Sequence, residues 1–374
     1  MQAFDFQPST RIVFGENRLD QLASLVQTEG GSRMLVVTDP GIVKAGIVDR
    51  ALQVLKTASL DAFVFSDVAE NPATRHVEAG VAFAQEIASA TRPIDFIIGL
   101  GGGSAMDCAK GINFILTNGG RMQDYWGVDK ATKPMLPSIG IPTTAGTGSE
   151  AQSFALITNE KTEQKMACGD KKARFRAVIL DPVLTESVPR QVAAATGIDA
   201  ISHAVESYVT IRRNPISKMF AQTAWGLLEQ SFERVLSTPE DIEARSQMLL
   251  GAHLAGAAIE NAMLGAAHAC ANPLTAKYGI THGVAVALIL PHVIEFNNQA
   301  VCTLYQELHP SKPLHERIIE LKVAANLPTR LRDFGIDQTD LTQLGKDAAS
   351  EWTGKFNPRP VDETELFALY NAAY

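Results

Sequence analysis

The first half of the chain alternates short apolar segments with longer amphipathic ones. The short segments are rich in β-branched or aromatic residues, which predicts β-strands: residues 34–38, 62–65, 96–100 and 139–141. Between them, Gly46–Thr57 and His76–Ala90 carry apolar residues at three- and four-residue spacing, as amphipathic helices do. A last apolar run, Ala177–Leu180, ends at Asp181–Pro182. This alternation predicts a parallel, Rossmann-like sheet with helices on both faces.

After about Pro189 the strand pattern stops, and long Ala/Leu/Glu-rich segments follow. Their lengths and composition predict helices over residues 194–210, 217–236, 239–263 and 316–374. We therefore expect an α/β domain over residues 1–185 and an all-helical domain over residues 186–374. Clefts between domains commonly hold small molecules, so we expect a ligand site where the two pack.

Composition and charge narrow the possible partners. The chain has 374 residues, a formal net charge of −8 and 20% charged residues, which argues against nucleic acid or an anionic membrane as a partner. Apolar runs such as Val284–Pro291 are too short to span a bilayer, and residues 1–11 lack the apolar core of a signal peptide. The four cysteines show no CxxC spacing. A reduced, cytoplasmic protein is the expectation.

The segment Gly99–Asp107 is a glycine-rich turn that follows a predicted strand and opens a helix. Glycines there let a phosphate approach the backbone, and the free N–H groups of the helix N-terminus favour an anion. Ser104 provides either an N-cap or a hydroxyl for a phosphate. A tight turn without a ligand is the alternative, although three consecutive glycines after a buried strand favour the phosphate site.

Two further segments fit a nucleotide site in the same sheet. The loop Pro142–Glu150 carries three threonines, a serine and two glycines after another predicted strand, so it could form the opposite wall. Asp39 ends the first predicted strand, where a carboxylate receives ribose hydroxyls and repels a 2′-phosphate, which favours NAD over NADP. A turn-forming Asp before Pro40 explains Asp39 equally well.

Four side chains in the helical half predict a metal site. Asp199 and His203 are four residues apart, so a helix places both on one face; a local salt bridge would use the same spacing. His268 and His282 lie among small and apolar residues, where a histidine without a hydrogen bond or a metal is costly. One carboxylate and three imidazoles suit Fe(II) or Zn(II) better than Mg(II) or Ca(II).

At this point the sequence resembles the iron-containing alcohol dehydrogenases over nearly its whole length. The resemblance rests on motifs found in order and at family-like spacing: Phe14–Gly15, Glu70–Thr74, Gly101–Lys110, Pro142–Glu150, Gly197–Glu206, His282–Ala285 and Asn357–Arg359. It implies the dehydroquinate synthase-like fold, with a dinucleotide-binding first domain and a metal-binding helical domain. It also implies a homodimer or a larger homo-oligomer.

The resemblance implies roles for individual residues. Asp199, His203, His268 and His282 match the four metal ligands, which usually hold Fe(II) and in some members Zn(II). A second set matches positions that line the NAD site: Asp39, Asn71, Gly102, Gly103, Ser104, Thr143, Thr144, Thr147, Phe154, Lys165 and Leu184. One position departs from the family, since Asn272 stands where many members have a histidine associated with proton transfer. Asparagine cannot carry a proton at neutral pH, so no catalytic proton carrier is assigned.

We therefore expect an NAD-dependent enzyme that interconverts a primary alcohol and its aldehyde by hydride transfer, with the substrate oxygen on a divalent metal. A polyol dehydrogenase of the glycerol type is the nearest alternative. A lyase like dehydroquinate synthase needs a cluster of Lys and Arg, whereas the segments around His268 and His282 contain only Lys277. A non-catalytic NAD- or metal-binding protein is the third alternative, slightly favoured by Asn272.

Overall fold

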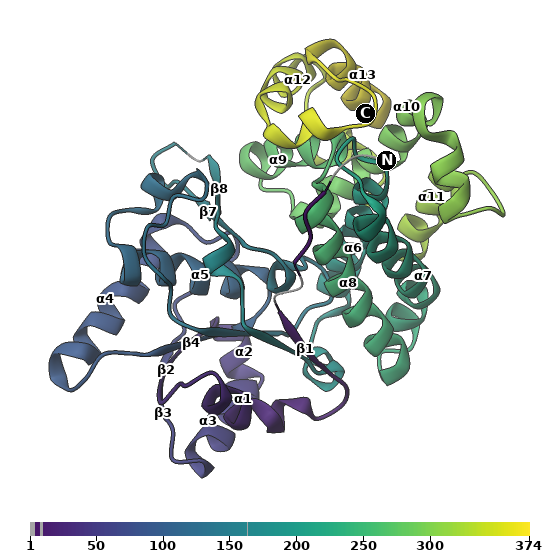
Figure 1. Cartoon of the computed structure of the whole chain (residues 1–374). Coiled ribbons are helices and arrows are strands. Elements are labelled where there is room, and N and C mark those ends of the chain that lie inside the picture. The colour runs from purple at the N-terminus through teal and green to yellow at the C-terminus, as the bar shows by residue number, and fades with distance from the viewer. Residues whose placement is uncertain (1–3, 8–9, 163) are drawn as a thin grey trace. The chain divides into compact units, whose positions relative to one another are not determined.

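The computed structural model describes residues 4–7, 10–162 and 164–374. The chain forms two compact units (Figure 1). One contains the described residues 7, 10–144, 149–162 and 164–188. The other contains residues 189–374 together with residues 4–6 and 145–148. The loop Pro142–Glu150 is thus divided between the two units. The order of predicted strands and helices along the chain did not indicate this division.

The α/β unit is built on a six-stranded parallel sheet with the strand order β1-β9-β6-β4-β2-β3. Its strands are β1 (Arg11–Phe14), β2 (Arg33–Val37), β3 (Asp61–Phe65), β4 (Phe96–Gly101), β6 (Ser138–Pro142) and β9 (Ala177–Leu180). The predicted strands are confirmed within one or two residues. β1 was not predicted, because four residues with one buried side chain give too short a pattern.

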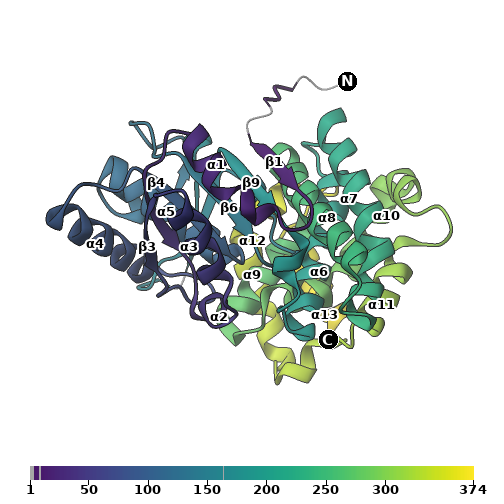
Figure 2. The ribbon, with the colours of Figure 1, turned by 90° about the horizontal axis from the view of Figure 1, so that it is seen from below.

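Helices cover both faces of this sheet, as the βα alternation predicts (Figure 2). Alternate residues of β2 point to opposite cores: Leu35 and Val37 join one apolar cluster, and Met34 and Val36 join the other. The helices of the unit are α1 (Leu22–Thr28), α2 (Pro40–Lys44), α3 (Ile47–Thr57), α4 (Thr74–Ala90) and α5 (Gly103–Asn118). Short 3-10 helices complete it: η1 (Arg18–Gln21), η2 (Met122–Tyr125), η3 (Ser149–Ala151), η4 (Lys171–Ala173) and η5 (Pro182–Thr185).

A second, three-stranded sheet in this unit was also absent from the sequence prediction. It has the order β5-β8-β7, with β5 (Gly127–Val128), β7 (Phe154–Thr158) and β8 (Lys165–Gly169). β7 and β8 pair antiparallel, and β7 packs on α5. The first domain is therefore not purely a parallel α/β structure.

The second unit is helical throughout the part that the structure describes. Its helices are α6 (Arg190–Val209), α7 (Pro215–Ser237), α8 (Ile242–Ala262), α9 (Ala266–Tyr278), α10 (His282–Leu308), α11 (Leu314–Ala324), α12 (Leu341–Ser350) and α13 (Glu363–Ala373). The 3-10 helices η6 (Leu331–Phe334), η7 (Gln338–Asp340) and η8 (Trp352–Phe356) join them. α6 packs against α7, α8 and α10, and every residue from 197 to 209 is buried. α6 is therefore the central helix of this unit.

α10 is long and apolar enough to cross a membrane by length and composition alone, but 61% of its apolar window is buried inside the protein. Burial of that extent is typical of a core helix. Its side chains join the same core as those of α6 and α9.

The inserted residues 145–148 pack on the helices of this second unit. A Cβ on Gly146 would lie 2.4 Å from the Cβ of Thr196 on α6, and one on Gly148 would lie 2.6 Å from the Cα of Gly256 on α8. Gly148 also has a φ of +59°, which favours glycine. The two glycines of this loop are therefore required by close packing.

Candidate active site

The four predicted metal ligands come from three helices of one unit. Asp199 and His203 lie one turn apart on α6, His268 lies in the first turn of α9, and His282 is the first residue of α10. The Nε2 atoms of His203, His268 and His282 lie 3.4, 3.5 and 3.9 Å from Oδ1 of Asp199. The structure thus brings the whole predicted set together around one carboxylate oxygen.

The donor atoms at the centre of this cluster fit a divalent cation. The ligand atoms of Asp199, His268 and His282 all lie within 4.8 Å of one another. Oδ1 of Asp199 and Nε2 of His268 are buried and have no hydrogen-bond partner among the described residues, which is costly unless another group binds them. Ligands about 2.1 Å from a shared ion in tetrahedral geometry are separated by about 3.4 Å, close to the observed distances.

Electrostatics also favour a cation here. Burial raises the pKa of Asp199, but the imidazoles of His203, His268 and His282 outweigh burial and hold it well below its usual range. Burial lowers the pKa of His203 to about 4, so this ring is neutral and able to bind a metal. Burial lowers the pKa of His268 too, but the carboxylates of Asp199 and Glu206 outweigh burial and raise it to about 9. The two carboxylates therefore favour a positive charge at His268. A bound metal would supply that charge in place of the proton on the ring.

Gly283 brings the start of α10 against α6. A Cβ at Gly283 would lie 1.9 Å from the backbone oxygen of Ala195, which is one turn before Asp199. Only glycine allows this approach, and the approach places His282 beside Asp199. Sequence reasoning quoted the His282–Gly283 pair as part of a motif but gave Gly283 no role.

His282 is the most accessible of the four ligands. Its side chain keeps 25% of its exposure, compared with 4–6% for the other three. The ring of His282 is therefore the least buried part of this cluster.

Asn272 lies one turn after His268 on α9 and is half-buried. Its Nδ2 donates a 2.8 Å hydrogen bond to Oε2 of Glu351. A carboxylate only accepts hydrogen bonds, so this contact fixes which end of the amide faces Glu351. Glu351 was not singled out from the sequence, because it is 79 residues away.

In the α/β unit, three predicted cofactor segments meet at one sheet edge. Asp39, the glycine loop and Thr143–Thr144 follow β2, β4 and β6, which are neighbours in the sheet. The backbone N–H of Thr143 donates to the carbonyl of Gly101 at 2.9 Å. Carboxyl ends of parallel strands are the usual place for ligands in such sheets.

The glycine loop forms the N-terminus of a long helix. Gly102 is the N-cap of α5, and Gly103 and Ser104 are its first residues; all three are partly exposed. The unpaired N–H groups of this 16-residue helix suit a phosphate. Thr144 faces the loop, since a Cβ at Gly102 would lie 3.4 Å from its Oγ1.

The two carboxylate oxygens of Asp39 have different surroundings. Its Oδ1 accepts hydrogen bonds from the N–H groups of Gly41 and Ile42, so it caps α2. Its Oδ2 lies 3.2 Å from the position of a Cβ on Gly101. One oxygen stabilises the turn, and the other lies beside the glycine loop.

The remaining cofactor candidates occupy different environments. Asn71 is exposed, with a left-handed φ of +51°, before α4. Phe154 and Lys165 lie at opposite ends of the β7–β8 pair. Thr143 is fully buried, and Leu184 is 2% exposed within an apolar core. Thr147 is partly exposed and belongs to the helical unit.

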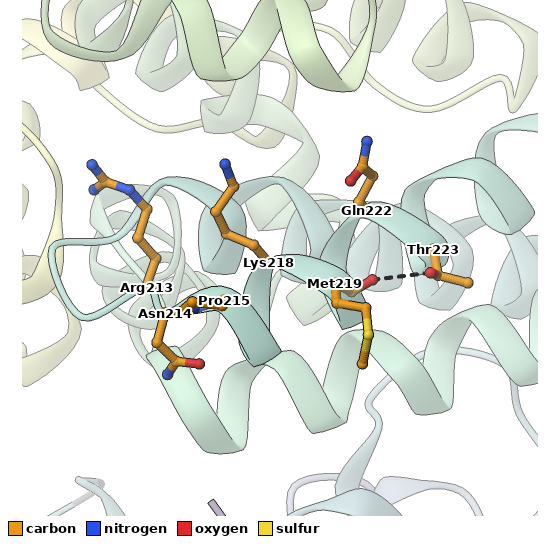
Figure 3. A pocket seen from close by; sticks show the side chains of 7 residues that line it. All are labelled: Arg213, Asn214, Pro215, Lys218, Met219, Gln222 and Thr223. Atoms are coloured by element: carbon orange, nitrogen blue, oxygen red, sulfur yellow. Dashed lines mark hydrogen bonds between the residues drawn. The ribbon is translucent and has the colours of Figure 1, made fainter. Parts of the chain in front are cut away.

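A separate pocket lies at the start of α7, and Figure 3 shows its lining residues Arg213, Asn214, Pro215, Lys218, Met219, Gln222 and Thr223. Its cations have protein partners: Arg213 donates to the carbonyls of Val209 and Thr210, and Lys218 pairs with Glu307. None of the predicted site residues lines this pocket.

The fold and the site define an α/β unit with a dinucleotide-type edge joined to a helical unit with a metal cluster. Residues 9–182 match the family described as iron-containing alcohol dehydrogenase, and residues 193–374 match the Fe-containing alcohol dehydrogenase family, C-terminal. The chain belongs to the iron-containing alcohol dehydrogenases. It is a metal-dependent enzyme that uses NAD to interconvert alcohols and aldehydes.

Individual relatives are similar over nearly the whole chain. Alcohol dehydrogenase 4 of Schizosaccharomyces pombe is 36% identical, over 96% of this chain and 87% of the relative. The crystal structure of 1,3-propanediol oxidoreductase is 32% identical with a TM-score of 0.95, covering 100% of both chains. Sulfoacetaldehyde reductase from Bifidobacterium kashiwanohense, solved in complex with NAD+, is 28% identical with a TM-score of 0.90, covering 100% of this chain and 99% of the other.

Proposed function

We propose that Asp199, His203, His268 and His282 hold the catalytic metal for oxidation of a primary alcohol to its aldehyde and for the reverse reaction. The observation that carries this proposal is the approach of three imidazole Nε2 atoms to one buried oxygen of Asp199. A divalent metal bound there supplies Lewis acidity toward an alcohol or carbonyl oxygen. Fe(II) is the proposed ion, and the ligand set also suits Zn(II).

The protein's own contribution is to hold these proposed ligands in fixed positions and to exclude water from them. α6 provides two ligands from a segment that is buried on all sides, and Gly283 allows the third helix to approach it. Water is therefore kept from three of the four ligands, and ligands fixed in advance reduce the cost of reaching the reactive arrangement.

We propose that NAD is held by the residues at the edge of the sheet and by neighbouring positions. The N-terminus of α5, with Gly102, Gly103 and Ser104, would bind the diphosphate. The free oxygen of Asp39 would accept hydrogen bonds from the adenosine ribose. The other proposed contacts are Asn71, Thr143, Thr144, Thr147, Phe154, Lys165 and Leu184. Thr143 and Leu184 would act through their backbone or by packing, because their side chains are buried.

The proton of the alcohol needs an acceptor, and Asn272 is unable to serve as one. We propose that the proton leaves through water or through the ribose hydroxyls of the cofactor. The hydrogen bond to Glu351 orients the Asn272 amide but gives it no titrating group.

The same proposal includes the substrate, the oligomeric state and the cellular location. A short primary alcohol is the proposed substrate, and a polyol remains the second candidate because one similar structure is a 1,3-propanediol oxidoreductase. A homodimer or larger homo-oligomer is proposed from the family resemblance. A cytoplasmic location is supported by the four cysteines, which are all free.

The test is a NADH-absorbance assay of anaerobically purified, metal-analysed protein with NAD and a panel of primary alcohols, diols and aldehydes. Turnover should follow metal content and should be lost in Asp199→Asn. A protein that binds NAD and metal tightly but turns over none of these substrates would refute the enzymatic proposal.

A further inference from the structure

Glu206 is a buried carboxylate on α6 that contacts a proposed metal ligand. It is 3% exposed, and its Oε2 lies 2.5 Å from Nδ1 of His268. Its other oxygen, Oε1, accepts a 2.8 Å hydrogen bond from the backbone N–H of Ala267. Both oxygens of the side chain therefore act on the first turn of α9.

The contact with Glu206 determines which nitrogen of His268 is available to a metal. A carboxylate accepts hydrogen bonds, so Nδ1 of His268 carries the hydrogen in this contact. Nε2 of the same ring lies 3.5 Å from Oδ1 of Asp199, at the centre of the cluster. When the ring is neutral, the tautomer that Glu206 favours has its hydrogen on Nδ1, so the lone pair of Nε2 points toward the position proposed for the ion.

The surroundings of Glu206 at the start of α9 leave no room for a side chain on Gly265. A Cβ at Gly265, the N-cap of α9, would lie 2.9 Å from Oε1 of Glu206 and 3.0 Å from Oδ1 of Asn357. Asn357 accepts a hydrogen bond from the N–H of Ala266 and forms a reciprocal amide pair with Asn297 on α10. The N-terminus of a 13-residue helix also favours a negative charge at this position.

We propose that Glu206 is a positioning residue that fixes the orientation and the metal-binding nitrogen of His268. This inference rests on the proposed metal role of His268. Glu206 reaches the reaction only through His268. Partners of this kind typically contribute about 10- to 100-fold to metal affinity.

A purely structural role, as a cap for α9, would predict a different result from Glu206→Gln. The amide oxygen could still accept from Ala267, while the NH₂ group would face Nδ1 of His268. That arrangement favours hydrogen on Nε2, the nitrogen that the metal needs. A cap would survive this substitution, whereas the metal-binding orientation would not.

The experiment measures zinc affinity by competition with a chromophoric chelator, together with the visible spectrum of the Co(II)-loaded protein. We expect Glu206→Gln to bind zinc about 10- to 100-fold more weakly than wild type, with an altered Co(II) spectrum. Thermal unfolding of the metal-free protein should change little. Glu307→Gln is the matched control, since Glu307 also bonds a side chain of α6, the hydroxyl of Tyr208, but contacts no ligand; it should keep wild-type affinity.

Equal zinc affinity and identical Co(II) spectra in Glu206→Gln and wild type would overturn the role of Glu206. Failure of the wild-type protein to bind zinc or cobalt would instead overturn the proposed metal site. If Glu206→Gln does not fold, NMR of the zinc-loaded wild type decides. A slowly exchanging, strongly downfield Nδ1–H of His268 is then expected, and its absence would contradict the proposal.

Discussion

The side-chain amide of Asn272 donates a hydrogen bond to the carboxylate of Glu351, and this contact holds the amide one helical turn beyond the proposed ligand His268. Because Nδ2 faces Glu351, Oδ1 faces away from it. Glu351 thus orients a group that is unable to titrate.

This relationship makes Asn272→His an informative change. An imidazole at this position would introduce a group that titrates near neutral pH and hydrogen-bonds to a carboxylate. We expect the pH profile of kcat/KM for alcohol oxidation to gain an inflection between about pH 5 and 8. Asn272→Gln introduces no titrating group and should keep the original profile. Superimposable profiles of the histidine variant and wild type would show that this position does not govern the proton route.

Gly283 gives a test of how the metal site is assembled. In Gly283→Ala the new methyl group meets the backbone oxygen of Ala195, so α10 has to move away from α6. We expect at least tenfold weaker zinc binding and a loss of about 1–3 kcal/mol in the free energy of unfolding, as is usual for overpacking. Gly226→Ala on α7 is the control, because nothing lies within 4 Å of its Cβ position. An undiminished zinc affinity in Gly283→Ala would count against the close approach.

Asp39 allows cofactor selection to be separated from helix capping. Asp39→Asn keeps an acceptor oxygen for Gly41 and Ile42 but removes the negative charge. We expect the ratio of kcat/KM for NADP to that for NAD to rise by about tenfold, which corresponds to about 1.4 kcal/mol. Thermal stability should stay close to wild type. An unchanged cofactor ratio would remove Asp39 from the proposed ribose site.

Lys322 on α11 predicts a pH-dependent stability. It is 4% exposed, with no carboxylate at ion-pair distance among the described residues, and burial lowers its pKa to about 8. Between about pH 8 and 10.5 the unfolded chain binds more protons at this lysine than the folded protein, so its contribution to stability rises with pH. One pKa unit corresponds to about 1.4 kcal/mol.

Lys322→Met should therefore be more stable than wild type at pH 7, by up to about 3 kcal/mol. The difference should shrink toward pH 10, where the wild-type amine is neutral when folded. Chemical unfolding of both proteins at the two pH values measures this, with the exposed Lys346→Met as control. A difference that does not change with pH would contradict the buried, uncompensated charge.

The sequence predicted best those features that a short stretch of residues indicates by itself. The four proposed ligands were predicted from helical spacing, apolar surroundings and family motifs, and the structure brings these four side chains together. The parallel strands were predicted because buried strands are continuous apolar runs. Glu206, Gly283 and Glu351 were given no role from the sequence because their contacts are with residues far along the chain, up to 88 residues for Gly283 and Ala195. The β7–β8 pair was missed because each of its strands has only five residues.

The chain leaves the α/β unit at residue 145 and returns to it at residue 149. A fragment starting at Pro189 would therefore lack the four residues that cover Thr196 and Gly256. Without the loop, Thr196 on α6, the helix that carries Asp199 and His203, and Gly256 on α8 would lose this packing. We therefore expect a fragment cut at the apparent domain boundary to be less stable than the same helices in the whole chain, because it lacks residues 145–148.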